Sequence, residues 1–193
     1  MINNVTKMID ENMPSLEKCL SEYAAYHLDE KNLYSHFIGI PMIVFAVMCF
    51  SSRFGVLVGY FDFTLSLLLI ILLSSYYFTL DRAFALLMTL LLLAIYPFAY
   101  VIAQFQLLTW LSVSVGFFLV GWVVQFIGHI FEKKRPAFFD DIRGLIIGPL
   151  FVLVEFAFII GYRKALQQQV LNNARQLREQ MDREESVINA SAL

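Results

Sequence analysis

Five long apolar runs, separated by short polar stretches, make up most of the chain. They cover residues 37–50, 55–80, 83–103, 107–131 and 144–162. A helix needs about 20 apolar residues to cross the hydrocarbon core of a membrane. The first run is short for this, so we expect it to tilt, to thin the bilayer locally or to re-enter. The pattern predicts an all-α fold: a polytopic membrane helix bundle of four to five transmembrane or re-entrant helices.

Residues between and within the runs indicate how the helices meet. The second and third runs join at Asp81 and Arg82, which predicts a tight turn and an antiparallel helix pair. Small residues on a membrane helix allow close packing against a neighbour. In the fourth run they are Gly116, Gly121 and Gly128.

Polar helices are expected at both ends of the bundle. An amphipathic helix should begin near residues 14–17 and run to about His27, with Leu16, Leu20, Tyr23 and His27 on one side. The polar stretch 29–32 predicts a break, with Asn32 capping the next helix. Residues 163–193 predict a polar helix, either a solvated end or a contact between two copies of the chain. We expect one integral membrane domain over 1–193, comprising an interfacial region (1–36), a bundle (37–162) and this tail.

Composition supports membrane insertion and excludes several classes of protein. The chain is 59% hydrophobic and 16% charged, with a mean hydropathy of +0.68. Its net charge of −2 gives no indication of nucleic-acid binding. Cys19 and Cys49 are too few for a disulfide framework or a thiolate metal site. The polar, acidic first 35 residues do not resemble a signal peptide.

Positive charges predict the orientation of the bundle. If the first four runs all span, the N-terminal region and the loop after the fourth run lie on one side of the membrane. Basic residues favour the cytoplasmic side, and they occur in both segments: Lys7, Lys18, Lys31, Lys133, Lys134, Arg135 and Arg143. The fifth run either spans as well or returns at Gly148 and Pro149. A bacterial inner membrane and an endoplasmic reticulum membrane fit equally well.

The most informative polar residues lie where the fourth run meets the loop that follows it. Helical spacing places Gln125, His129 and Glu132 on one face. Ionisable groups at such a depth in a membrane are candidate functional residues. The alternative is a polar stripe that only caps the end of the helix.

All three histidines of the chain lie at polar edges of apolar runs, on the same expected side of the membrane. His27 and His36 are nine residues apart and would point in opposite directions on one continuous helix, so a shared site requires the break at 29–32. Three neutral imidazoles suit zinc, iron, nickel or copper. The alternative is three interfacial histidines with ordinary hydrogen bonds. Residues able to orient the rings are Asn32, Gln125, Glu132 and Asp140.

Two stretches resemble the signatures of a known family. Residues 26–36, YHLDEKNLYSH, followed by FIGIP, resemble Y-H-x-x-P-x-N-x-x-x-H. Residues 121–141, GWVVQFIGHIFEKKRPAFFDD, followed by GPLFVLVEF, resemble G-W-x-x-Q-F-x-G-H-x-x-F-E-K-x-x-P-A. Both signatures are those of the 2-hydroxy fatty acid dioxygenases of fatty acid α-oxidation. The resemblance of this chain to that family covers roughly residues 20–162.

The resemblance implies an Fe(II) enzyme that converts a long-chain 2-hydroxy fatty acid and O2 into CO2 and the fatty acid one carbon shorter. His27, His36 and His129 match the histidines that hold iron in the family, while Asn32, Gln125, Glu132, Pro136 and Asp140 match other recurrent positions. Two residues depart from the pattern. Leu28 stands where a fungal member has a further histidine, and Glu30 replaces the usual proline. A fourth ligand would then have to be Glu132 or water.

Several assignments stay open from the sequence alone. Arg135 or Lys133 either pairs with the substrate carboxylate or only sets the membrane orientation. Glu155, inside the fifth run, is either a supporting site residue or a buried protonated carboxyl. The competing functions are a non-catalytic scaffold or lipid-binding membrane protein and a zinc-dependent membrane lipid hydrolase. Metal content would distinguish them.

Overall fold

The computed structural model describes residues 15–139 and 141–191. The described residues form a helical bundle with one small hairpin, which confirms the expected all-α class. In chain order the elements are α2 (Ser15–Ala24), α3 (Glu30–Ser51), β1 (Gly55–Val58), β2 (Phe61–Thr64), α4 (Leu65–Leu80), α5 (Arg82–Ala103), α6 (Leu107–Glu132), the 3-10 helix η1 (Ala137–Phe139), α7 (Arg143–Ile159) and α8 (Lys164–Ser191).

Three helices are long and apolar enough to cross a membrane, as far as the described residues extend. They are α3, α5 and α6, and α4 is a shorter apolar helix. Many of their large apolar side chains are exposed, including Leu72, Leu90 and Leu119. Exposed apolar area on this scale marks a surface that contacts lipid or a partner, which supports membrane association of the bundle.

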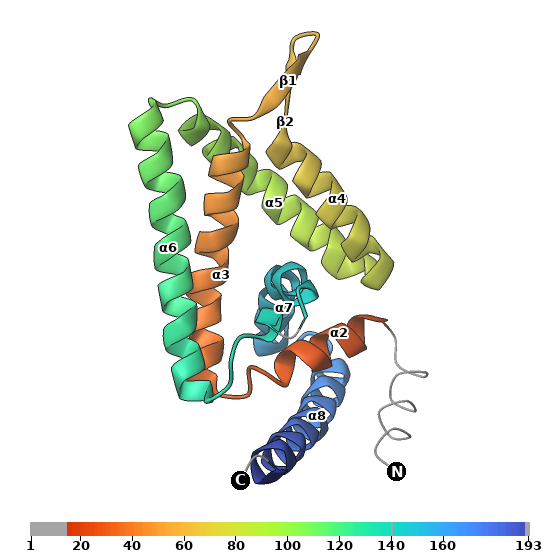
Figure 1. The fold of residues 1–193 in the computed structure, drawn as a ribbon. Coiled ribbons are helices and arrows are strands. Elements are labelled where there is room, and N and C mark those ends of the chain that lie inside the picture. The colour runs from red at the N-terminus through yellow and green to blue at the C-terminus, as the bar shows by residue number, and fades with distance from the viewer. Residues whose placement is uncertain (1–14, 140, 192–193) are drawn as a thin grey trace.

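Helices α3 and α6 pack side by side through small residues (Figure 1). A Cβ added to Gly39 would lie 2.7 Å from the carbonyl oxygen of Gly121, so the two backbones approach closely. Of the three glycines expected to form a packing surface on α6, Gly121 and Gly128 face α3. At Gly116 an added Cβ would meet no atom of the described chain within 4 Å.

Helices α4 and α5 form the antiparallel pair expected from the turn at Asp81. The Asp81 carboxylate accepts hydrogen bonds from the backbone N–H groups of Ala83 and Phe84, which caps α5. Arg163, between α7 and α8, forms an ion pair with the same carboxylate at 2.5 Å. Tyr77 on α4 donates a hydrogen bond to the carbonyl oxygen of Ile146 on α7. The pair is therefore attached to the rest of the bundle.

The structure corrects the expected ends of two segments. Helix α2 ends at Ala24 rather than near His27, because the N–H groups of Tyr26 and His27 turn back to the carbonyls of Tyr23 and Ala24. The break before α3 is confirmed, but its cap is Asp29 rather than Asn32. The Asp29 carboxylate accepts from the N–H groups of Lys31 and Asn32.

One further apolar run differs from expectation, and for another run one of the two open alternatives is not observed. The run 55–80 begins as a β-hairpin instead of a helix, with Val58 paired to Phe61 across a two-residue loop. Gly59 has a φ of +63° in this loop, a conformation that glycine adopts without strain. The fifth run does not return at Gly148 and Pro149, because α7 continues through both residues to Ile159.

The polar helices gather at one end of the α3–α6 pair. Helix α2 and the middle of α8 lie near the beginning of α3 and the end of α6, where Arg178 of α8 contacts Glu132 (Figure 1). The buried residues Leu16, Leu20 and Tyr23 line one side of α2, as predicted. Helix α8 packs on α2 through Val170 and Ala174, which are fully buried. The C-terminal helix is therefore part of the folded body rather than only a solvated end.

Candidate metal centre

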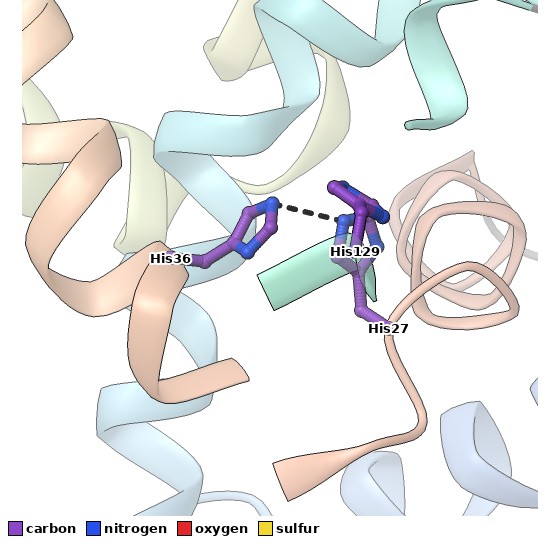
Figure 2. A group of neighbouring side chains, drawn as sticks. All are labelled: His27, His36 and His129. Atoms are coloured by element: carbon purple, nitrogen blue, oxygen red, sulfur yellow. Dashed lines mark hydrogen bonds between the residues drawn. The ribbon is translucent and has the colours of Figure 1, made fainter. Parts of the chain in front are cut away.

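Three separate segments deliver the three histidines to one place. His27 lies in the connection between α2 and α3, His36 lies in the second turn of α3, and His129 lies in the last turn of α6. Figure 2 shows the three side chains gathered in one place, with a dashed line between His27 and His36. All three side chains are buried, with relative exposures of 5%, 1% and 6% in chain order. The break at Asp29 brings the rings of His27 and His36 together.

The three rings are close enough for one ion to contact all of them. The Nε2 atoms of His27 and His36 are 3.1 Å apart. The ring centroid of His129 lies 5.0 Å from that of His27 and 5.1 Å from that of His36. One nitrogen from each ring falls within 4.8 Å of the other two, and no other group of three such side chains does so within the described residues.

Hydrogen bonds to the backbone fix which nitrogens of His27 and His36 point inward. Nδ1 of His27 is 2.6 Å from the carbonyl oxygen of Tyr23, and Nδ1 of His36 is 2.9 Å from that of Asn32. A carbonyl only accepts, so each Nδ1 carries the proton when these bonds form. In two neutral rings, both Nε2 atoms are then unprotonated and face each other with their lone pairs.

A proton shared between the two Nε2 atoms would relieve the repulsion between their lone pairs, but it is unfavourable here. It would be the third proton on two imidazoles and would make one of them a cation. Burial, together with the neighbouring His36, holds the pKa of His27 well below its usual value. A bound metal ion removes the repulsion without adding a proton.

The spacing fits metal ligands. Metal–imidazole bonds are about 2.0–2.1 Å long, so two nitrogens at a right angle on one ion lie roughly 3 Å apart. Among the described residues, neither ring nitrogen of His129 has a hydrogen-bond partner of normal geometry, although a backbone group of Lys134 lies nearby. Buried polar atoms without partners are rare. The residues present therefore fit a metal ion of the kind that imidazoles bind.

Glu132 supports the histidine segments rather than joining the ligand group. Its Oε2 accepts hydrogen bonds from the backbone N–H of Asp29 at 2.8 Å and from the Asn32 side-chain amide at 3.1 Å. Its Oε1 accepts from Arg178 at 2.8 Å. Both carboxylate oxygens are thus engaged, and the carboxylate joins the end of α6 to the start of α3.

A mostly apolar cavity of about 320 Å³ extends from the three histidines into the bundle. Gln125 lies with the histidines on its wall, and Ser51 and Ser66 lie on the wall as well. From His36 to Ser51, α3 rises roughly 22 Å. The lining between them is apolar and includes Ile40, Val44, Met48, Ile70, Leu73 and Trp122. The volume is in the range of small-molecule sites, and the length suits an extended alkyl chain.

The other residues predicted at the site lie in different places, and only one of those that the structure describes lines the cavity. Gln125 is buried on the cavity wall, as the helical spacing indicated. Arg135 is exposed, and Glu155 is buried in α7, but neither lines the cavity. Lys133 is exposed and ends α6 in a left-handed conformation, with a φ of 56°. Asp140 lies outside the described residues.

Sequence reasoning missed two residues that contact the centre or its support. Tyr23 stacks on His27 with ring centroids 4.2 Å apart and accepts its Nδ1–H. Arg178 lies on the side of α8 that carries Val170 and Ala174. A lone arginine on the apolar stripe of an amphipathic helix was the available signal, but the pattern does not reveal its partner.

The fold and the centre define a class of protein: an all-α, membrane-associated protein with a buried three-histidine site at the wall of an apolar cavity. Comparison with known proteins gives the family. The chain matches the family described as "2-hydroxy-palmitic acid dioxygenase Mpo1-like" over residues 13–160, and it belongs to that family. This confirms the family expected from the two sequence signatures.

A curated relative covers most of the chain. The "2-hydroxy-palmitic acid dioxygenase MPO1" of Saccharomyces cerevisiae is 33% identical over 159 residues, which are 81% of this chain and 88% of the yeast protein. No solved structure matches the chain significantly.

Proposed function

We propose that the chain is an Fe(II)-dependent dioxygenase that shortens a long-chain 2-hydroxy fatty acid by one carbon. The reaction is RCH(OH)COOH + O2 → RCOOH + CO2 + H2O, which balances without a further reductant. The single observation that carries the proposal is the approach of the His27 and His36 Nε2 atoms to 3.1 Å, beside His129 on the wall of an apolar cavity. The name of the yeast relative supports the substrate class.

His27, His36 and His129 would hold the iron. When bound, Fe(II) supplies Lewis acidity and the capacity to react with O2. The Tyr23 and Asn32 carbonyls hold the rings of His27 and His36 in one tautomer, so the inward nitrogens are ready to bind metal without losing a proton. Three protein ligands leave room at the ion for the substrate.

The cavity would bind the substrate in one direction. Each buried methylene of the alkyl tail contributes about 0.8 kcal/mol, so the tail belongs among the apolar residues between α3 and α4. The carboxylate and hydroxyl then lie beside the histidines, where the Gln125 amide can donate a hydrogen bond to them. The exclusion of water by this lining protects the reacting end from side reactions.

The substrate would reach the centre from the bilayer, in which a long-chain acid is dissolved. The histidines lie at the end of the α3–α6 pair where α2 and α8 gather. Basic residues in this region, including Lys31, Lys134 and Arg178, favour the cytoplasmic face. We therefore infer an active site at the cytoplasmic end of a membrane bundle.

The test combines metal content with turnover. Protein purified in detergent without oxygen is analysed for iron and zinc, and then receives Fe(II), 2-hydroxypalmitate and O2. We expect about one iron per chain and formation of pentadecanoic acid and CO2. His129→Gln should lose both iron and product, whereas Ile130→Ala, at an exposed neighbour on α6, should keep them.

Other outcomes distinguish the competing functions. Zinc in place of iron, with cleavage of a lipid ester, would support a zinc-dependent hydrolase. A protein that binds no metal and makes no product across several chain lengths would support a scaffold or lipid-binding protein.

A further inference from the structure

Helix α8 begins after the region that matches the family. The match covers residues 13–160, and α8 runs from Lys164 to Ser191. Val170, Ala174 and Arg178 are spaced four residues apart and lie on one side of the helix. The first two are fully buried, and the Arg178 side chain is 16% exposed. A buried stripe that ends in a guanidinium needs an acceptor in the body of the protein.

The acceptors of Arg178 lie on two segments that carry histidines. Nη1 donates to Glu132 Oε1 at 2.8 Å and to the Ala25 carbonyl at 2.7 Å, while Nη2 donates to the Glu132 carbonyl at 3.0 Å. Ala25 is two residues before His27, and Glu132 is three residues after His129 in the last turn of α6. One side chain of α8 therefore joins the α2–α3 connection to the end of α6.

The network continues from Glu132 to the third histidine. The Glu132 side chain is only 2% exposed, and it accepts hydrogen bonds from Asp29 and Asn32. The backbone carbonyl of Asn32 in turn accepts the Nδ1–H of His36 at 2.9 Å. A charged group buried to this extent needs a charged partner, and the Arg178 guanidinium is the partner of this carboxylate.

We propose that Arg178 is a positioning residue that sets the geometry of the three-histidine centre from the C-terminal helix. It acts by holding the Glu132 carboxylate in place, so that Asp29 and Asn32 hold His27 and His36 opposite His129. The inference rests on the proposed function only in that the centre binds a metal. It does not depend on the substrate or on turnover.

The experiment measures Co(II) binding to full-length, metal-free protein in detergent by its visible absorption. We expect Arg178→Gln to weaken Co(II) binding by about ten- to a hundredfold, the usual effect of removing a residue that orients metal ligands. The absorption spectrum of the remaining complex should shift, because the ligand geometry changes. Arg178→Lys, which keeps a cation near Glu132, should recover part of the affinity.

Two control variants separate positioning from docking of the helix. Asn173→Ala removes the hydrogen bond of 2.9 Å that the Asn173 amide on α8 donates to the Glu17 carboxylate on α2. It leaves the Arg178–Glu132 pair in place. Arg183→Gln removes an exposed arginine from the same helix. Asn173→Ala should lower the melting temperature but leave Co(II) affinity unchanged, and Arg183→Gln should change neither.

The proposal is overturned if Arg178→Gln binds Co(II) as wild type does, if Asn173→Ala loses as much affinity as Arg178→Gln, or if wild type binds no Co(II). Failure of the proposed function gives a different result. In that case wild type binds metal and Arg178→Gln weakens it, but 2-hydroxypalmitate is not converted.

Discussion

The Nε2 atoms of His27 and His36 face each other at 3.1 Å, although the two rings come from different segments of the chain. Both outer nitrogens are engaged by backbone carbonyls, so the inner ones meet lone pair to lone pair. Two neutral rings in this tautomer repel each other, and a bound metal ion would remove that repulsion. This arrangement has consequences for stability that can be measured without any enzyme assay.

Metal should stabilise the fold, and the stabilisation should depend on His27. A ligand that binds only the folded state raises the free energy of unfolding by mass action, by about 2.7 kcal/mol at a concentration 100 times its Kd. The melting temperature rises as a result. In His27→Phe the stack on Tyr23 can persist, while the repulsion and the metal ligand are both removed. We expect Fe(II) or Zn(II) to raise the melting temperature of wild type and not of this variant.

The same melts include an internal check. Without metal, His27→Phe loses both the facing lone pairs and the hydrogen bond to the Tyr23 carbonyl, so its own metal-free melting temperature is the baseline for the metal effect. Tyr34→Phe, at an exposed position near the start of α3, should respond to metal as wild type does. Equal melting temperatures of wild type with metal and with a chelator would contradict the assignment of the site.

Acidification should destabilise the metal-free protein through His27. Burial holds the pKa of His27 below its usual value in the folded chain. Above about pH 6.5 this histidine is neutral in both the folded and unfolded states, so its contribution to stability is fully present. Below that pH the unfolded chain binds a proton that the folded chain excludes, and stability falls by up to about 1.4 kcal/mol per pH unit. Melting at pH 7.5, 6.5 and 5.5 measures this, and the decline should be shallower in His27→Phe.

The sequence was informative where a single local rule determines the structure. Apolar length predicted the bundle, the polar stretch at 29–32 predicted the break between His27 and His36, and helical spacing placed Gln125, His129 and Glu132 on one buried face. The hairpin before α4 was not predicted because Val56–Val58 are as apolar as the helix that follows, although Asp62 interrupts the second strand. Gly59 was the local signal for a turn.

Contacts between distant segments were beyond sequence reasoning. No pattern within α8 shows that Arg178 meets Glu132, 46 residues earlier in the chain. Likewise, the spacing of Glu155 in its apolar run could not reveal that it lies away from the cavity wall. Periodicity predicts which side of a helix is buried, but the identity of the facing residue depends on tertiary packing.

A methyl group at Gly128 should disrupt the centre. An added Cβ would lie 2.6 Å from Asn32 Oδ1 and would also collide with Ser35 Oγ. Overpacking of this kind costs about 1–3 kcal/mol, and here it would move Asn32, whose carbonyl orients His36. We expect Gly128→Ala to lower both the melting temperature and the metal affinity.

Gly116 provides a matched control on the same helix, because an added Cβ there meets none of the residues that the structure describes within 4 Å. Gly116→Ala should be neutral or stabilising by up to about 1 kcal/mol, since alanine is the better helix former. Equal behaviour of the two variants would show that α3 and α6 can separate at Gly128 without cost. Thermal melts and Co(II) titrations of both proteins decide the matter.

The preference for substrate chain length should depend on the residues that line the cavity far from the histidines. Ser66 is 1% exposed, lines the cavity at the start of α4, and its hydroxyl has no hydrogen-bond partner within the described part of the chain. Leucine at this position adds about two heavy atoms to a packed wall, so we expect Ser66→Leu to favour substrates shorter by roughly two carbons. One excluded methylene changes kcat/KM by roughly tenfold or more. Competition among 2-hydroxy acids of 12 to 18 carbons measures the shift. Ser75→Leu, at an exposed position on the same helix, should keep the wild-type preference. If both variants kept it, the alkyl tail would have to lie outside this cavity.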